Sequence, residues 1–380
     1  GNAHDWFLSL PTLSRSLLIL SLIFIVLFII SLVTLQISNS QQGREARLKE
    51  ILAAVEQKQL SADASLIYDD RSRARELISE SEQLLALVDE RLREHQEFRA
   101  MKRELENLSN KIDNVILIDE PAQLAALSSG ASNVPLALTA RGASLLVSSQ
   151  DTIFSYDRAR KELLDLSTHE KIPSIGCAGA RSEGEIFFCS GDGKRLYLMA
   201  LPDTTVLSSA FSTPDGSLPN RILFYGDRLY AFSTQSGMLS RHQKSGDGYG
   251  AGTAWFREST ERLKGARDIA LDGLVYVLTH DGSLAVFRSG RSISPSIPAA
   301  TTNLLKPATR IIANAELEYL YALDPVNKRI IIIDKRAFTP LGQITSPALS
   351  HPQDFSVSKE RKTIIVLDGG RLLSLPYEVK

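Results

Sequence analysis

The chain has 380 residues, of which 43% are hydrophobic, and its 43 Lys and Arg nearly balance 44 Asp and Glu to give a net charge of -1. This balance argues against nucleic acid as a partner, because proteins that bind it normally carry a basic patch or stripe. Two cysteines are too few for a metal framework. The residues after Gly43 exceed what one small core usually holds, so at least two folded regions are expected.

A membrane-spanning helix is predicted within residues 16–43, which lie between Arg15 and Arg44 and contain no charged side chain. A bilayer core about 30 Å thick needs roughly 20 apolar residues, so the stretch is long enough to span it. A buried helix of a soluble domain would rarely be apolar on every face. A cleavable signal peptide has a shorter apolar region, of about 7 to 15 residues, before a small-residue cleavage site. We therefore expect a single-pass membrane protein with the lipid bilayer as one partner.

The flanks of this span bear on its direction. One arginine, Arg15, precedes it, whereas Arg44, Arg47 and Lys49 follow it. The positive-inside rule applied to these residues alone would place the following domain in the cytoplasm. The chain begins at Gly1 rather than Met, and residues 1–15 are too short to fold by themselves. We expect them to be the flank of a longer protein, whose upstream residues would also enter the charge count.

Residues 44–114 are predicted to form a helical stalk. They are rich in Glu, Arg, Leu and Ala and contain no proline, and these are strong helix formers over a long window. A first helix has one apolar face, made by Leu48, Ile51, Leu52 and Val55. Asp70 suits the N-cap of a second helix from Arg71 to about Leu87. The two predict a helical hairpin, somewhat like one tetratricopeptide-type unit.

A third helical stretch carries an apolar seam at alternating spacings of three and four residues: Phe98, Met101, Leu105, Leu108 and Ile112. The seam covers only about two heptads, fewer than a coiled coil needs as its sole support. Packing of the seam onto the same chain is one interpretation, and a homodimer held by the stalk is the other.

A repeat begins after Asn114, where short β-rich runs separated by Gly, Asp, Asn and Ser replace the helix formers. One apolar run recurs, and the second residue of each copy serves as a marker: Leu146, Phe187, Tyr230, Tyr276, Tyr321 and Ile365. The markers lie 41 to 46 residues apart, which matches one four-stranded propeller blade of about 40 to 50 residues. The six markers predict an all-β six-bladed propeller over residues 115–380, whereas a β-sandwich would not explain a constant period.

The last repeat ends at Leu375 and leaves no room for an outermost strand. We expect Val115–Ile118, which precede the first blade, to supply that strand. Such an exchange between the two ends of the domain would leave the ring without a free edge.

These repeats resemble NHL-type and related β-propellers, in segments such as Gly273-Leu274-Val275-Tyr276-Val277-Leu278 and Tyr319-Leu320-Tyr321-Ala322-Leu323-Asp324-Pro325 with Asn327-Lys328-Arg329-Ile330. The whole arrangement is similar to the C-terminal, membrane-anchored region of bacterial proteins with a PPM (PP2C)-type phosphatase-like domain upstream of the membrane helix. The likeness includes Ala64-Ser65-Leu66-Ile67-Tyr68-Asp69-Asp70 and Ala74-Arg75-Glu76-Leu77. This resemblance implies a propeller outside the cytoplasm. It assigns no phosphatase activity to any residue here, because the metal-binding aspartates belong to the upstream domain.

Four consecutive innermost strands are predicted to begin with alternating charges, in the order Arg221, Asp268, Arg310 and Asp354. At one level near the central channel, opposite charges on neighbouring blades would form pairs that fix how the blades register, and such pairs are usually structural. The alternative is a polar ligand site at the channel mouth. These four residues are the ligand-binding candidates.

Cys177 and Cys189 are spaced evenly about position 183, in the turn between the first two strands of the second blade. They are predicted to oppose each other across an antiparallel pair. In an extracytoplasmic domain they could form a disulfide, and two free buried thiols are the alternative.

No catalytic residue, metal site or cofactor is predicted. The six histidines show no ligand spacing, and the Asp-Gly pairs at 192, 247, 281 and 368 suit tight turns better than cation sites. We expect a membrane-anchored propeller that binds an unknown protein or cell-envelope ligand, as the sensing half of a bacterial signalling protein, and no enzyme activity in this chain. An enzyme with its active site in the propeller channel, or a structural scaffold of the cell envelope, are the alternatives.

Overall fold

The computed structural model describes residues 43–68, 70–127, 137–141, 144–149, 152–157, 160–166, 174–182, 184–201, 205–246 and 248–377. The chain divides into two compact units, Gly1–Ile112 and Asp113–Lys380, close to the predicted end of the stalk. The predicted membrane helix lies outside the described residues, apart from Gly43, and so do residues 1–15. Among the helices that are described, none has the length and apolar character needed to cross a membrane.

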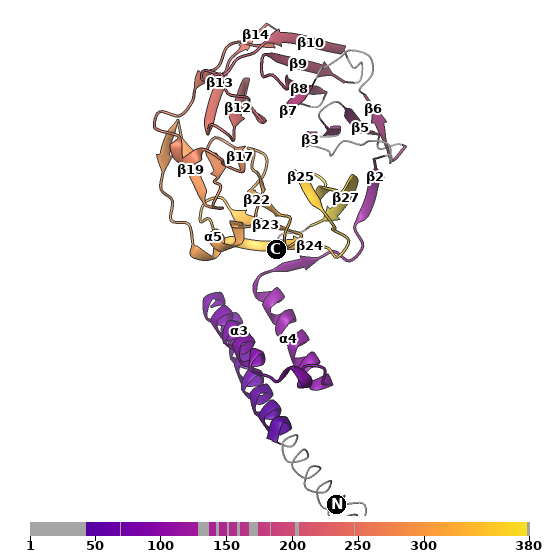
Figure 1. Cartoon of the computed structure of the whole chain (residues 1–380), viewed down its shortest axis with the longest axis vertical. Helices are drawn as coiled ribbons and strands as arrows, with labels where there is room; N and C mark the ends of the chain where they lie inside the picture. The colour runs from indigo at the N-terminus through magenta and orange to yellow at the C-terminus, as the bar shows by residue number, and fades with distance from the viewer. Residues whose placement is uncertain are drawn as a thin grey trace, which may run out of the picture. The chain divides into compact units, whose positions relative to one another are not determined.

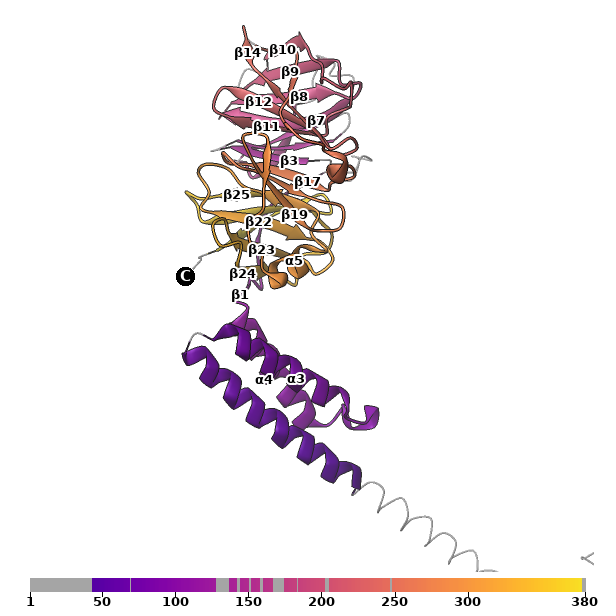
Figure 2. The ribbon, with the colours of Figure 1, turned by 90° about the vertical axis from the view of Figure 1, so that its left-hand side faces the viewer.

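The described part of the first unit is helical. Residues 43–67 form one helix, followed by α3 (Arg71–Ala86), a short 3-10 helix η1 (Glu90–Leu92) and α4 (Gln96–Ile112). Asp70 caps α3 as predicted, because its side chain accepts a hydrogen bond of 3.0 Å from the backbone N–H of Arg73. Figure 2 shows the three long helices running beside one another.

One apolar core holds these helices together. Val55 from the first helix and Leu77 from α3 are buried in it with most of the predicted seam of α4: Phe98, Leu105, Leu108 and Ile112, with Met101 at its edge. The seam therefore packs within the same chain, as the first of its two interpretations predicts. A stalk dimer stays a prediction, and it would have to use another face of the unit.

The second unit is a six-bladed propeller, and Figure 1 shows its blades around a centre. Blade one contains β3 (Ala137–Arg141), β4 (Ser144–Ser148), β5 (Ile153–Asp157) and β6 (Glu162–Asp165). Blade two contains β7 (Ile175–Ser182), β8 (Glu185–Ser190), β9 (Arg195–Ala200) and β10 (Thr205–Ala210). Blade three contains β11 (Arg221–Tyr225), β12 (Arg228–Ser233), β13 (Met238–His242) and β16 (Thr253–Ala254), with a side hairpin of β14 (Lys244–Ser245) and β15 (Gly248–Tyr249).

The remaining blades complete the ring. Blade four contains β17 (Asp268–Leu271), β18 (Val275–Leu278), β19 (Leu284–Arg288) and β20 (Arg291–Ile293), after the short helix η2 (Glu261–Leu263). Blade five follows α5 (Ala299–Leu305) and contains β21 (Arg310–Ile312), β22 (Tyr319–Asp324), β23 (Arg329–Asp334) and β24 (Pro340–Thr345). Blade six contains β25 (Pro352–Ser358), β26 (Thr363–Asp368) and β27 (Arg371–Pro376).

The first strand of every blade lies innermost. Each inner strand contacts the inner strands of both neighbouring blades, and the last contact, between β25 and β3, closes the circle. The six sequence markers all fall on the second strand of a blade, so the predicted period identified the blades correctly. Large apolar side chains on these second strands fill the clusters between blades, which is how a propeller buries both faces of each sheet.

The strand that completes blade six is not the predicted one. Val115–Leu117 form β1, which pairs in parallel with β24 and becomes a fifth, outermost strand of blade five. The closing strand is β2 (Ala122–Ala126), which pairs antiparallel with β27. Closure by strand exchange is therefore confirmed, but the residues that perform it were predicted wrongly. The sequence Ala-Gln-Leu-Ala-Ala has low strand propensity, so its pairing depends on the free edge of β27 rather than on local preference.

A buried polar side chain lies at the end of the second strand of every blade or directly after it: Ser149, Ser190, Ser233, Thr279, Asp324 and Asp368. These groups bond to the turn that follows or to nearby backbone. For example, Thr279 donates to Asp281 Oδ1 at 2.5 Å, and that oxygen accepts the N–H of Ser283 at 3.0 Å. Asp281-Gly282 therefore serves a turn, as predicted, and its glycine has a φ of +84°. Asp247 lies outside the described residues.

Candidate functional site

The four charged residues singled out in the sequence begin equivalent parts of four inner strands. Each lies opposite the residue two positions after its blade's marker, as the pairs Arg221 with Phe232 and Asp268 with Leu278 illustrate. Arg310 and Asp354 occupy the same register in blades five and six. We call these four residues the charged arc.

The arc covers four of six equivalent positions. In blade one the position is Ala137, opposite Ser148, and in blade two it is Cys177, opposite Cys189. Sequence reasoning did not connect these two residues with the arc. The equivalent residues precede their markers by 8 to 11 positions, because the turns differ in length and β7 contains a register shift between Ala180 and Ser182. The strand register, rather than a fixed spacing, is the signal that identifies them.

Asp268 links three blades. Its Oδ1 accepts a hydrogen bond of 2.7 Å from Arg221 Nε in blade three, and its Oδ2 accepts one of 2.9 Å from the N–H of Ile311 in blade five. Arg310 Nη1 lies 3.9 Å from Oδ1. The carboxylate therefore joins its own blade to both neighbours.

Asp354 makes the corresponding connections in blade six, two blades further along the ring. Its Oδ2 accepts hydrogen bonds from Arg310 Nη2 at 3.1 Å and from the N–H of Leu138, in blade one, at 2.9 Å. Its Oδ1 accepts the N–H of Phe355 at 2.9 Å. The charged arc thus binds blades three to six together and ties blade six to blade one, which confirms that these charges pair across neighbouring blades.

Burial shapes the electrostatics of the arc. It raises the pKa of the Asp268 and Asp354 carboxyls, although the charge of Arg221 and backbone N–H groups act in the opposite direction. Burial also disfavours the charged form of Arg221, but the attraction of Asp268 and Asp354 outweighs this and raises the pKa of its guanidinium. The charges of the arc stabilise one another, because removing one would leave its partner buried and unpaired.

A cavity of about 270 Å³ follows the inner strands of all six blades. Arg221, Asp268 and Asp354 line it, together with apolar side chains such as Leu223 and Ile312. A second set of polar residues, which were not predicted from the sequence, lines the cavity at the far ends of two inner strands: Asn314, Glu316, Ser358, Lys359, Glu360 and Arg361. Their position at or after the ends of β21 and β25 could have identified them, since the ends of inner strands that run in the same direction meet at one end of the channel.

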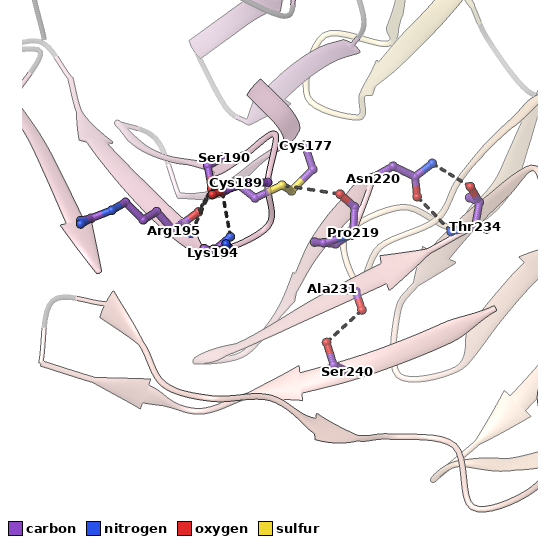
Figure 3. Close-up of a disulfide and its surroundings, with 11 residues drawn as sticks. Cys177, Cys189, Ser190, Lys194, Arg195, Pro219, Asn220, Ala231, Thr234 and Ser240 are labelled. Carbon is purple, nitrogen blue, oxygen red and sulfur yellow. Dashed lines mark hydrogen bonds between the residues drawn. A yellow bond between two sulfur atoms is a disulfide. The ribbon is translucent and has the colours of Figure 1, made fainter. Parts of the chain in front are cut away.

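Cys177 and Cys189 are joined by a disulfide with a Cα–Cα distance of 5.1 Å, and they are directly opposed partners of β7 and β8, as predicted. Figure 3 shows the disulfide beside Pro219, whose carbonyl oxygen lies 3.7 Å from Cys189 Sγ. Pro219 precedes Arg221 by two residues. The disulfide therefore packs against the segment that leads into the charged arc.

Within the described ranges, no group of three or more His, Cys, Asp or Glu side chains is placed to hold a metal ion. His242 is buried in blade three, where its Nε2 lies 2.9 Å from Ser240 Oγ and its Nδ1 lies 2.9 Å from the carbonyl oxygen of Gly250. Its ring stacks on Phe211 with centroids 4.4 Å apart. This histidine serves the packing of its blade.

No family model and no curated protein matches the sequence. Solved structures with similar folds include virginiamycin B lyase from Staphylococcus aureus, at 12% identity and a TM-score of 0.45, over 67% of this chain and 88% of that one. Kuenenia stuttgartiensis hydrazine synthase has 10% identity and a TM-score of 0.46, over 65% and 96% of the two chains. A chain of the mitotic checkpoint complex has 12% identity and a TM-score of 0.48, over 69% and 84%. The six-bladed assignment rests on the strand pairing, and none of these likenesses bears on what this chain binds.

Proposed function

We propose that this chain is a membrane-anchored binding module whose propeller receives a ligand in the channel cavity, as the ligand-binding half of a bacterial signalling protein. The observation that carries the proposal is the cavity itself, where apolar walls from the inner strands surround a few fixed charged groups. Such a combination is typical of binding pockets, in which apolar surface supplies affinity and a small number of polar groups supply orientation.

Two further features support a location at the membrane with the propeller outside the cytoplasm. Residues 16–43 carry no charge over a length that suits a bilayer. The disulfide between Cys177 and Cys189 is of a kind that persists in oxidising compartments and is rare in the cytosol. For this placement the disulfide outweighs the positive-inside count of the residues next to the span.

The location is tested with the full chain expressed in a bacterium. We expect it to remain in the membrane fraction after an alkaline wash, and we expect Ile25→Arg combined with Phe28→Arg to release it, because arginine near the centre of a bilayer is costly. The side of the membrane on which the propeller lies is inferred from the redox state of its cysteines. Free thiols are blocked in intact cells, and the protein is then analysed on a non-reducing gel. Recovery of the unaltered chain in the soluble fraction, or of reduced cysteines in growing cells, would count against this placement.

The binding activity is tested separately with the full chain in phospholipid nanodiscs, incubated with a low-molecular-weight extract of the bacterial envelope. We expect a bound compound that raises the thermal unfolding midpoint and is recovered chemically unchanged. Recovery of a chemically altered compound would favour a channel enzyme instead. An extract that leaves the unfolding midpoint unchanged and yields no bound compound would favour a structural scaffold.

A further inference from the structure

The six equivalent inner-strand positions follow a pattern that repeats every two blades. Blades three and four carry Arg221 and Asp268, and blades five and six carry Arg310 and Asp354. Blades one and two carry Ala137 and Cys177. The ring therefore has two Arg–Asp pairs and a third pair in which both charges are missing.

This gap gives the two arginines different surroundings. Arg310 has a carboxylate on each side, since Asp354 in the next blade lies 3.1 Å away and Asp268 in the preceding blade lies 3.9 Å away. Arg221 has Asp268 in the next blade at 2.7 Å, and the charge of Asp354 also attracts it, although the two form no ion pair in the described part of the chain. In the preceding blade, the residue equivalent to Asp268 is the half-cystine Cys177.

A disulfide cannot replace the missing carboxylate. Cys177 carries no charge because its sulfur is bonded to Cys189, and both residues are buried in an apolar cluster with Ile222. The guanidinium of Arg221 has five N–H donors. Its Nε bonds to Asp268, but its two terminal nitrogens make no hydrogen bond to any residue in the described part of the chain.

Arg221 lines the cavity together with Ala178, Gly179 and Ala180, the small residues that follow Cys177 on β7. These three residues have a methyl side chain or none. Gly179 cannot carry a larger side chain, because a Cβ there would lie 2.7 Å from the carbonyl oxygen of Ile222.

We propose that the terminal nitrogens of Arg221 bind the carboxylate of a small ligand, which takes the place of the missing third aspartate of the ring. A carboxylate has two oxygens in one plane, and the guanidinium fork binds them in parallel. The inference rests on the proposed function, in that it takes the channel cavity to be the ligand site, and it adds the chemical class of the ligand.

The cavity also limits the rest of the ligand. Its volume of about 270 Å³ is small, and its walls near the arc include Leu223, Ile312 and Val357. Asp268 and Asp354 would repel a second negative charge nearby. A monocarboxylate with a compact apolar body therefore suits the site better than a dicarboxylate or a phosphate.

The test uses the full chain in nanodiscs and isothermal titration calorimetry, with isobutyrate and benzoate as probes. Isobutyramide and benzamide are matched uncharged probes of nearly the same shape, and sulfate is a tetrahedral anion. We expect each carboxylate to bind about tenfold or more tightly than its amide, and sulfate to bind more weakly than either carboxylate. Arg221→Lys should weaken carboxylate binding about tenfold while keeping the charge beside Asp268, whereas Arg228→Lys, on the surface of the same blade, should leave it unchanged.

A second pair of variants tests the missing aspartate directly. Cys177→Asp with Cys189→Ser supplies the third carboxylate from the protein, so it should abolish binding of the probes. Cys177→Ser with Cys189→Ser removes the disulfide without adding a charge, so its dissociation constant should stay within about threefold of the wild-type value. The thermal unfolding midpoint is measured for both, and if the aspartate variant fails to fold, the Arg221→Lys comparison decides.

Several results would overturn the inference: equal binding of acids and amides, sulfate binding as tight as carboxylate binding, or full binding by Arg221→Lys. If the carboxylates fail while a neutral envelope compound binds in the cavity, the ligand class is wrong and the proposed binding function stands. If carboxylates bind through Arg221 but the chain is not a membrane protein, the proposed location fails and this inference stands.

Discussion

At the scale of single residues, Asp268 joins three blades through one side chain. Asp268→Asn keeps the shape but removes the charge opposite Arg221 and replaces one acceptor oxygen with a donor. Breaking a buried pair in this way costs about 3 to 5 kcal/mol. We expect a loss of that size in urea unfolding, with Asp227→Asn in an exposed turn as a control that changes stability by less than about 0.5 kcal/mol. Equal effects of the two substitutions would contradict a joining role for Asp268.

His242 makes stability depend on pH. Its burial lowers the pKa of the imidazole, although the carbonyl of Gly250 opposes this. The unfolded chain therefore takes up the proton first, near pH 6.5, and stability present above that pH is lost as the pH falls. Between pH 7.5 and 5.5 the contribution of this residue is at most about 1.4 kcal/mol. We expect urea midpoints to fall over this range and the fall to be smaller in His242→Asn, whereas His280→Asn, an exposed histidine, should keep the wild-type dependence.

The charged arc could be predicted from the sequence because an apolar run precedes each marker, and an Arg or Asp is unusual at the start of such a run. The equivalence of Cys177 with the residues of the arc could not be predicted. The first hairpin of its blade has two register shifts, and a cysteine in a hydrophobic strand is normally interpreted as a residue of the core. Arg221 and Arg310 differ in the residue that the preceding blade places beside them. This difference can be recognised only after the six inner strands have been aligned by their register.

At the scale of secondary-structure elements, β2 holds the ring closed through one buried residue. Ala125 lies in a cluster shared by blades one and six, with Leu138 and Leu372 among its neighbours, whereas the adjacent Ala126 points outward. Ala125→Asp would place an unpaired charge in that cluster and should cost about 3 kcal/mol or more. Ala126→Asp adds the same charge on the exposed face and should change stability little. Chemical unfolding of both variants distinguishes them, and equal midpoints would mean that β2 does not close the propeller.

The blades were predictable because each repeats one pattern, apolar second strand then polar turn, at a nearly constant interval. The closing strand was not, because strand propensity favours Val-Ile-Leu over Ala-Gln-Leu-Ala-Ala. Both segments find an edge to pair with, but β1 takes the edge of β24 and β2 takes the edge of β27. Tertiary context thus decided between two candidates that local preference ranks in the opposite order.

At the scale of the whole molecule, each unit has its own hydrophobic core, so each should unfold in its own transition. Leu105 is buried in the core of the helical unit, and Leu105→Ala should cost about 2 to 5 kcal/mol there. By calorimetry we expect the transition of the helical unit to move to lower temperature while the propeller transition stays in place. Lys102→Ala, an exposed neighbour on α4, serves as the control. A single transition that shifts as a whole would show that the two units unfold as one.

The closure of blade six also determines when the ring can be completed, because its two partners come from opposite ends of the propeller sequence. The ribosome synthesises β2 before any blade, yet the strand it pairs with, β27, is the last strand among the described residues. During translation β2 has no partner, so it must wait, unpaired, until every blade has emerged. A chain that stops before β27 therefore lacks one strand of blade six and also leaves β2 without the edge that it pairs with.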